Sequence, residues 1–490
     1  MYRVRGGQTS IFDDEKMFGG VELDIENHWI KLSKLIPWAE VEKRYAQTFK
    51  GKHTGNPGCN SRMAIGSLII KERYGFSDQD TVDEIQMNPY LQYFIGLTTF
   101  THKAPFDQST MTLFRKRITP QMLSELNDFI SGRRNPYEEK EDDDQDDSSD
   151  EDPNGKGGNT NDGTLILDAT CVPQDIRYPT DGSLLNEARE KLENMIDVLH
   201  ANVGGKKPRT YRKIAHKVYC RLIRNRKPSK KLIRKFVRTQ LGYVKRNLGI
   251  VDALMQDSTI GLSARQATQL ETIRALYYQQ KTMYDGNVHT IANRIVSIAQ
   301  PWVRPIVRGK TKAPVEFGAK IEVSLVDGYA QIEAFSWEAF NEGTTLIDSV
   351  KRYYANYGHF PARILADRIF RTRDNLAFCK QLGIRMNGPK LGRPLRDKEV
   401  HKEQLRLERA ESGERSAVEC YFGVGKRRYT LNLIKTRLAT TSEVSIRIAL
   451  LTMNLFRKLR FLFCLICAPY FNSLKMRLHN CFACRLRLAS

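Results

Sequence analysis

The chain has little that would place it in or across a membrane. Its most apolar stretch, residues 461–471, is too short to span a bilayer and follows the basic sequence RKLR. The first residues, MYRVRGGQTSIFDDEK, contain no apolar segment of the secretory kind. Nine cysteines are scattered over 490 residues. We therefore expect a cytoplasmic protein with reduced thiols.

Acidic residues are missing from one long segment. Residues 206–246 contain seventeen Lys or Arg and no Asp or Glu, with four aromatic residues between the cations. Such a segment cannot be neutralised by ion pairs within its own helices, so it faces solvent ions or phosphates. We interpret it as a nucleic-acid contact, and the alternative is a solvated basic face. The candidate contacts are Lys213, Lys217, Arg221 and Arg224.

Positive charge also dominates the whole chain. The formal net charge is +22 and the isoelectric point about 9.5, which favours a polyanionic partner. The segment 138–152 holds eleven acids and one Lys, so the remaining chain carries +32. Residues 136–162 are predicted to be a disordered linker because dense like charge, Gly and Pro cannot form a core. A solvated tether is favoured over a phosphate mimic that occupies a basic groove.

Helical patterns dominate residues 1–135. Amphipathic stretches occur at 65–74, 81–93 and 111–118. The sequence PFDQSTMTLFRKRI leads from a capping-type cluster into a basic helix, which is compatible with a helix-turn-helix-like DNA reader containing Arg115 and Lys116. An ordinary helical bundle is the alternative.

Two strand patterns carry an acid. TLILDAT contains Asp168 and ARILADRIF contains Asp367. Between them, AKIEVSLVD and YAQIEAF form a predicted hairpin at Asp327-Gly328. Helices near 344–356 and 372–382, and a short strand near 384–386, complete a predicted mixed α/β sheet with flanking helices. Residues 184–307 are helical in pattern and interrupt it.

A third acid occurs in ERSAVECYFGVGKRRY. Arg415, Glu419 and Lys426 have the spacing of one helix face, and Arg427 follows directly. A salt-bridged surface helix would show the same spacing. Three acids on three elements of a basic protein indicate another possibility, in which carboxylates hold two divalent cations. Hard ions such as Mg²⁺ or Mn²⁺ prefer these ligands.

Other groups compete with this assignment. Three further aspartates fit turn positions better than positions in a carboxylate site on a strand: Asp327, Asp175 and Asp181. Glu408, Glu411 and Glu414 lie in a charged run and are predicted to be solvated. Near the C-terminus, four cysteines have almost the spacing of a zinc ribbon. A C-terminal amphipathic segment used for packing or self-association is favoured over zinc binding. The four are Cys464, Cys467, Cys481 and Cys484.

Together, TLILDATCVPQDIRYPTDGSLLNEAR, RILADRIFRTRDN and ERSAVECYFGVGKRRYTLNLIKTRL resemble the DDE transposases of bacterial insertion sequences, in the IS5 or broader IS4-like group. The resemblance implies a ribonuclease-H-like core and a triad of Asp168, Asp367 and Glu419 with Mg²⁺ or Mn²⁺. It also implies phosphate contacts by Arg415 and Lys426. The family motif has Tyr where this chain has Ser412.

The resemblance implies a nucleoid-associated enzyme that binds double-stranded DNA at its element's ends and assembles as a dimer or higher oligomer. The predicted regions are a helical DNA-binding domain at 1–135, the linker at 136–162, a core at 163–183 and 308–440, a basic insertion at 184–307 and a tail at 441–490. Two alternatives stay open, a nuclease that cuts without joining strands and an inactive DNA-binding relic.

Overall fold

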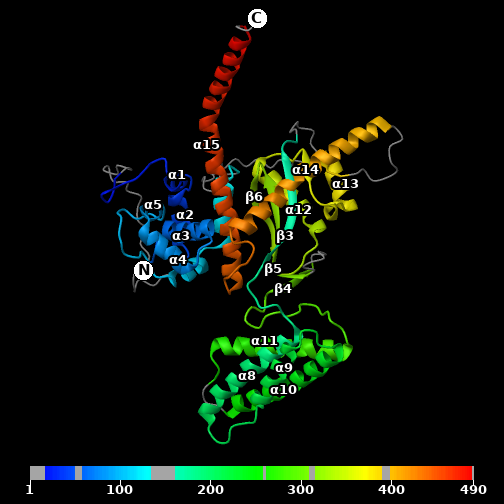
Figure 1. The fold of residues 1–490 in the computed structure, drawn as a ribbon. Coiled ribbons are helices and arrows are strands. Elements are labelled where there is room, and N and C mark those ends of the chain that lie inside the picture. Colours follow the sequence, from blue (N-terminus) through cyan, green and yellow to red (C-terminus); the bar gives the residue numbers. More distant parts are fainter. Residues whose placement is uncertain are drawn as a thin grey trace, which may run out of the picture.

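The computed structural model describes residues 17–49, 58–133, 161–257, 261–307, 315–388 and 398–487. A helical N-terminal region, a mixed sheet covered by helices and a helical layer below the sheet make up these residues (Figure 1). Most of the acidic segment predicted at 136–162 lies outside the described ranges. Within them, no helix has the length and apolarity needed to cross a membrane.

The central sheet is mixed, as predicted. Its path runs β4-β5-β3-β7-β8, and β6 pairs with the same edge of β5 as β4 does. β3, β5 and β6 pair antiparallel, whereas β7 and β8 run parallel to β3. The strands are β3 (Thr164–Pro173), β4 (Arg304–Val307), β5 (Val315–Val326), β6 (Tyr329–Ser336), β7 (Arg363–Leu365) and β8 (Arg385–Met386).

The hairpin between β5 and β6 forms where the sequence predicts it. Asp327 and Gly328 both have positive φ, at 51° and 78°. Two consecutive residues in this region match the two-residue turn whose twist suits a hairpin. Asp327 is therefore a turn residue, as the sequence indicates.

Helices cover both faces of the sheet. α12 (Leu346–Tyr357) and α13 (Arg373–Gln381) pack against Leu165, Leu167 and neighbouring apolar residues on one face. α14 (Lys398–Arg428) and the first turns of α15 (Ala439–Arg487) pack on the other face, against Ile166 and Val172. Because side chains alternate along a strand, Asp168 lies on the same face as Ile166 and therefore points toward α14.

The N-terminal region is helical, as predicted, but α15 completes its core. Val444, Ile448, Leu451 and Leu455 of α15 are buried in one cluster with Trp29 and the other N-terminal apolar residues. The C-terminal segment predicted as a separate tail at 441–490 thus begins inside another region's core. The N-terminal elements are β1 (Met17–Phe18), β2 (Val21–Glu22), α1 (His28–Lys34), α2 (Trp38–Ala46), α3 (Ser61–Tyr74), α4 (Asp78–Met87), α5 (Pro89–Phe94), α6 (Thr110–Arg117) and α7 (Pro120–Ile130).

The insertion between β3 and β5 forms a helical layer with its own apolar core. It lies below the sheet in Figure 1. Its first helix begins three residues before the predicted boundary, because Thr180 caps it. The predicted insertion at 184–307 also includes β4, which pairs with β5 and belongs to the sheet. The helices are α8 (Asp181–Val203), α9 (Arg212–Arg224), α10 (Lys230–Asp257) and α11 (Ala264–Gly286).

Candidate active site

The sheet places two of the three predicted acids side by side. β3 and β7 are parallel neighbours, and Ile166 is in register with Leu365. Continuing that register by two residues sets Asp168 opposite Asp367, just beyond the last paired residue of β7. Asp367 begins the short helix η2 (Arg368–Phe370), where its carboxylate accepts the N–H of Arg368 at 2.7 Å. Both aspartates therefore have fixed backbone positions at one point of the sheet.

Asp168 lies in an environment that disfavours its charge. Its side chain is 18% exposed and accepts a hydrogen bond from the backbone N–H of Ala169 at 2.9 Å. The pKa of Asp168 is raised to about 6, chiefly by burial and to a smaller extent by the charges of Glu342 and Asp367, while the Ala169 N–H and Arg415 oppose the shift. Loss of water around the carboxylate is therefore the main reason why its ionised form is disfavoured.

α14 supplies the third acid together with a cation. An Arg415 guanidinium nitrogen donates to Glu419 at 2.9 Å, and the other lies 4.0 Å from the Asp168 carboxylate. The four-residue spacing puts Arg415 and Glu419 on one side of the helix. Arg415 therefore connects the strand-borne acid to the helix-borne acid. Glu419 is 55% exposed, and Ser412 is exposed on the same helix.

Two ion pairs hold α14 against the sheet, and the sequence analysis did not predict them. Glu411 is buried and binds Arg385 of β8, while Glu414 binds Arg363 of β7 at 2.6 Å. The prediction of a solvated side chain is therefore wrong for Glu411, whereas Glu414 is 46% exposed and agrees with it. Their partners lie 26 and 51 residues away in sequence, so no local pattern marked the pairs.

The donor set suits a hard divalent cation. Asp168 lies opposite Asp367 in the extended register of β3 and β7, and Arg415 joins Asp168 to Glu419 of α14. Carboxylate oxygens of this kind are the donors that Mg²⁺ and Mn²⁺ prefer. The raised pKa of Asp168 indicates that added positive charge would stabilise its ionised form. Among the described residues, however, no group of three or more acids, histidines or cysteines is close enough to share a metal ion. Arg415 lies between two of the carboxylates.

Competing acids have structural partners. Asp181 starts α8 and binds Arg294 at 2.6 Å and Gln280 at 3.0 Å, so it ties the insertion together. The backbone N–H of Asp175 donates to the Ile434 carbonyl at 2.9 Å, and its backbone carbonyl accepts from the Gln300 side-chain amide at 3.2 Å. Neither approaches the aspartates of β3 and β7 in a recorded contact.

The predicted basic contacts occupy different settings. Four cations are exposed along α9 at intervals of four, four and three residues, which places them on one helix face: Lys213, Lys217, Arg221 and Arg224. Arg427 and Lys116 are exposed, and Lys426 is partly buried. Arg115 is only 4% exposed and binds Asp78 through both guanidinium nitrogens. Its charge is therefore committed to an internal carboxylate.

The cysteine motif is only partly within the described structure. Cys464 is exposed on α15. The side chains of Cys467, Cys481 and Cys484 lie outside the described residues. Zinc binding by this motif stays a prediction.

Comparison with known proteins adds two family matches. Residues 364–456 match the transposase DDE domain, and residues 22–117 match a transposase domain, DUF772. The first match contains Asp367, Arg415 and Glu419, while Asp168 lies outside both. Over these two segments the chain is similar to transposases. The chain carries the DDE domain and the DUF772 domain of transposases, which confirms the family resemblance seen in its sequence.

One curated relative is an uncharacterized protein of Rhizobium meliloti, ORF8 in the nfe locus. It is 38% identical over 97 residues, which cover 20% of this chain and 46% of that protein. The match thus spans less than half of the relative's length. No solved structure matches the chain.

Proposed function

We propose that this protein is a transposase of the IS5 or broader IS4-like group. It binds the terminal inverted repeats of its element and catalyses metal-dependent cleavage and strand transfer of DNA. The observation that carries this proposal is the placement of Asp168 opposite Asp367, with Arg415 joining Asp168 to Glu419, in a chain with two transposase-domain matches. The net charge of +22 supports DNA as the substrate.

The sheet supports a ribonuclease-H-like core, which the DDE-domain match implies. β6, β5 and β3 form an antiparallel half, and β7 and β8 extend the sheet in parallel with β3. Helices lie on both faces. The acids come from the middle of the sheet and from a helix packed on it, so rigid elements position them.

The three carboxylates would hold two Mg²⁺ or Mn²⁺ ions, which activate water or a 3′-hydroxyl and neutralise charge on the phosphate. Asp168 would contribute from β3, Asp367 from the start of η2 just after β7, and Glu419 from α14. The Arg415 guanidinium, which donates to Glu419 and lies 4.0 Å from Asp168, would donate hydrogen bonds to a non-bridging phosphate oxygen. Lys426, two helical turns further along α14, binds the same backbone.

The decisive experiment uses paired DNA ends taken from the sequence flanking this coding region. Wild-type protein with Mg²⁺ is expected to release a 3′-hydroxyl and join it to target DNA. Asp168→Asn should abolish both products while it leaves end binding within about twofold, because the removed charge lies at the reacting phosphate rather than along the duplex. Equal cleavage by Asp168→Asn and wild type would remove this residue from the site.

The two alternatives give different products. Hydrolysis without joining identifies a nuclease, and end binding without cleavage in either metal identifies a relic. Joining two ends in one reaction also requires the protein to assemble as a dimer or higher oligomer. Sedimentation of the protein with and without paired ends measures that directly.

A further inference from the structure

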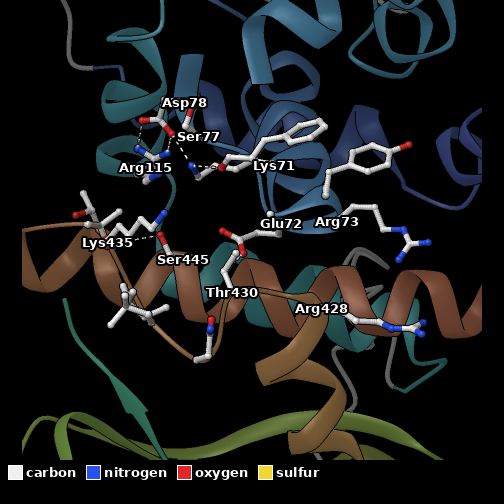
Figure 2. A pocket seen from close by; sticks show the side chains of 18 of the residues that line it. Lys71, Glu72, Arg73, Ser77, Asp78, Arg115, Arg428, Thr430, Lys435 and Ser445 are labelled. Carbon is white, nitrogen blue, oxygen red and sulfur yellow. Dashed lines mark hydrogen bonds and ion pairs between the residues drawn. The ribbon is translucent and has the colours of Figure 1, made fainter. Parts of the chain in front are cut away.

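A cleft of about 1160 Å³ lies between the N-terminal helices and the segment that joins α14 to α15. We refer to it as the interdomain cleft. Its first wall consists of residues 71–78 with Thr112 and Arg115, and its second wall is drawn from residues 426–445. Figure 2 shows Arg73 and Arg115 on the first wall and Arg428 and Lys435 on the second. The cleft therefore joins the two regions that match separate transposase domains.

Positive charge dominates the lining of this cleft. Eight cations and two acids contribute to it. The acids are Glu72 and Asp78, and the cations are Lys71, Arg73, Arg115, Lys426, Arg427, Arg428, Lys435 and Arg437. Such an excess of one sign, placed between two low-dielectric walls, concentrates an attractive field for anions.

The two acids offset only part of this charge, and both act within or between the walls. Asp78 is bound by Lys71 at 2.9 Å and by Arg115, so its charge is used within the first wall. Glu72 is 3% exposed and accepts a hydrogen bond from the Thr430 hydroxyl, which ties the walls together. Arg73 packs over the ring of Phe456, with its guanidinium carbon 4.4 Å from the centroid. The first wall is thus rigid and pre-organised.

The second wall keeps its cations available. Arg427, Arg428, Lys435 and Arg437 are all exposed. Within the part of the chain that the structure describes, none of them forms an ion pair with a carboxylate. Arginine and lysine presented in this way are suited to phosphate oxygens.

We propose that the interdomain cleft binds the sugar–phosphate backbone of the DNA flank beside the reacting phosphate. This rests on the proposed function. Lys426 follows Glu419 by seven residues on the same helix, a rise of about 10 Å. One strand of B-DNA advances about 3.4 Å per nucleotide, so the cleft begins about three nucleotides from the scissile bond. Its Lys and Arg side chains set the register of the duplex without reading its sequence.

The test measures how DNA affinity depends on salt for a variant that changes only the second wall. Arg428→Ala, Lys435→Ala and Arg437→Ala are combined in the full-length chain. The matched control combines Lys402→Ala and Arg406→Ala, two exposed cations near the other end of α14. The probes are a 40-base-pair duplex containing an element end and an unrelated duplex of equal length. Thermal unfolding monitored by circular dichroism verifies that both variants fold.

Loss of three phosphate contacts should reduce the slope of log K against log salt by about 2.7, on both duplexes. The control should retain the wild-type slope. In the triple variant, ethylation of phosphates about three or more nucleotides from the cleavage position should no longer interfere with binding to the end duplex. Ethylation at the cleavage position should still interfere. An unchanged slope in the triple variant, or an equal fall in the control, overturns the proposal. If the triple variant shows the reduced slope but the wild-type protein does not cleave DNA, the cleft is a DNA-binding site and the proposed transposase function is refuted.

Discussion

At the scale of single residues, the groups that surround each buried carboxylate distinguish the acid of the candidate active site from acids with a structural role. Asp168 faces a second aspartate and a cation of the candidate active site, so its raised pKa belongs to that site. Glu72 and Glu322 are also buried, and burial raises the pKa of each to about 7. Their partners are hydroxyl groups, Thr430 for Glu72 and Thr345 and Ser349 for Glu322. These two glutamates have structural roles.

The raised pKa of Glu72 predicts a specific pH dependence of stability. The ordinary value is 4.5, so the folded protein binds this proton more strongly than the unfolded chain does. The stabilisation is fully present below pH 4.5 and is lost as the pH rises through 7. Glu72→Gln removes the titration. We expect its unfolding free energy, relative to wild type, to increase by roughly 3 kcal/mol between pH 4.5 and pH 8.

Urea unfolding of both proteins at several pH values tests this expectation. Glu322 is present in both and cancels in the difference, so the comparison isolates Glu72. A difference that stays constant from pH 4.5 to 8 would show that Glu72 does not titrate in this range.

Sequence patterns predicted the candidate acids of the site but not the ion pairs that hold α14 against the sheet. Asp168, Asp367 and Glu419 were found because each interrupts an apolar strand or helix pattern or matches a family motif. Glu411 has no such mark, since it lies in a run of charged residues and its partner Arg385 is remote in sequence. Whether a charged helical residue is solvated or buried depends on what packs against it, which local patterns do not contain.

At the scale of elements, the predicted strands and helices of the sheet agree closely with the structure. The Asp327-Gly328 turn and the alternation along β3 carry strong local signals. β4 was missed because four residues next to a long helical insertion show no period. Their strand conformation depends on pairing with β5, which is a non-local effect.

The position of α14 predicts a difference between its two anchoring glutamates. Glu411 is 5% exposed and Glu414 46% exposed. Glu411→Gln should lower the unfolding free energy by about 1–2 kcal/mol because a buried partner is lost, whereas Glu414→Gln should cost about 0–0.5 kcal/mol. Since α14 also presents Glu419, we expect Glu411→Gln to reduce the cleavage rate more than the affinity for DNA ends.

Chemical denaturation and single-turnover cleavage measure these two quantities. Similar effects of the two substitutions on stability would contradict the difference in burial. A fall in end affinity as large as the fall in cleavage rate would show that α14 does not position the site separately from DNA binding.

At the scale of the whole molecule, three regions meet at one buried amide network. Asn454 of α15 donates to Asn127 of α7 and to the carbonyl of Ala330 in β6, both at 2.7 Å. It accepts the N–H of Ala330 at 3.1 Å. All these groups are buried, so each depends on the others for its hydrogen bonds. The N-terminal helices, the sheet and α15 are therefore joined by polar contacts as well as by apolar packing.

Asn454→Ala should disconnect these regions. Removing the amide leaves the Ala330 N–H and the Asn127 carbonyl oxygen without this partner, at a cost of about 2–4 kcal/mol. We expect calorimetry to show a broadened or split unfolding transition. Thr452→Ala is the matched control, because the Thr452 hydroxyl is buried on the same helix but bonds within it, to Ile448 at 2.7 Å. If both substitutions leave one sharp transition at similar temperatures, the network does not couple the regions.

The packing of α15 into the N-terminal core has a consequence for synthesis. The N-terminal helices leave the ribosome first, yet their core lacks Val444, Ile448, Leu451 and Leu455 until more than three hundred further residues have been added after Ile130. At roughly 5–20 residues per second, this interval lasts about 15–60 s. During it the nascent chain exposes an apolar groove. The core of the N-terminal helices is therefore completed only after α15 has been made, and the charged cleft beside them forms only after residues 426–445 have been added.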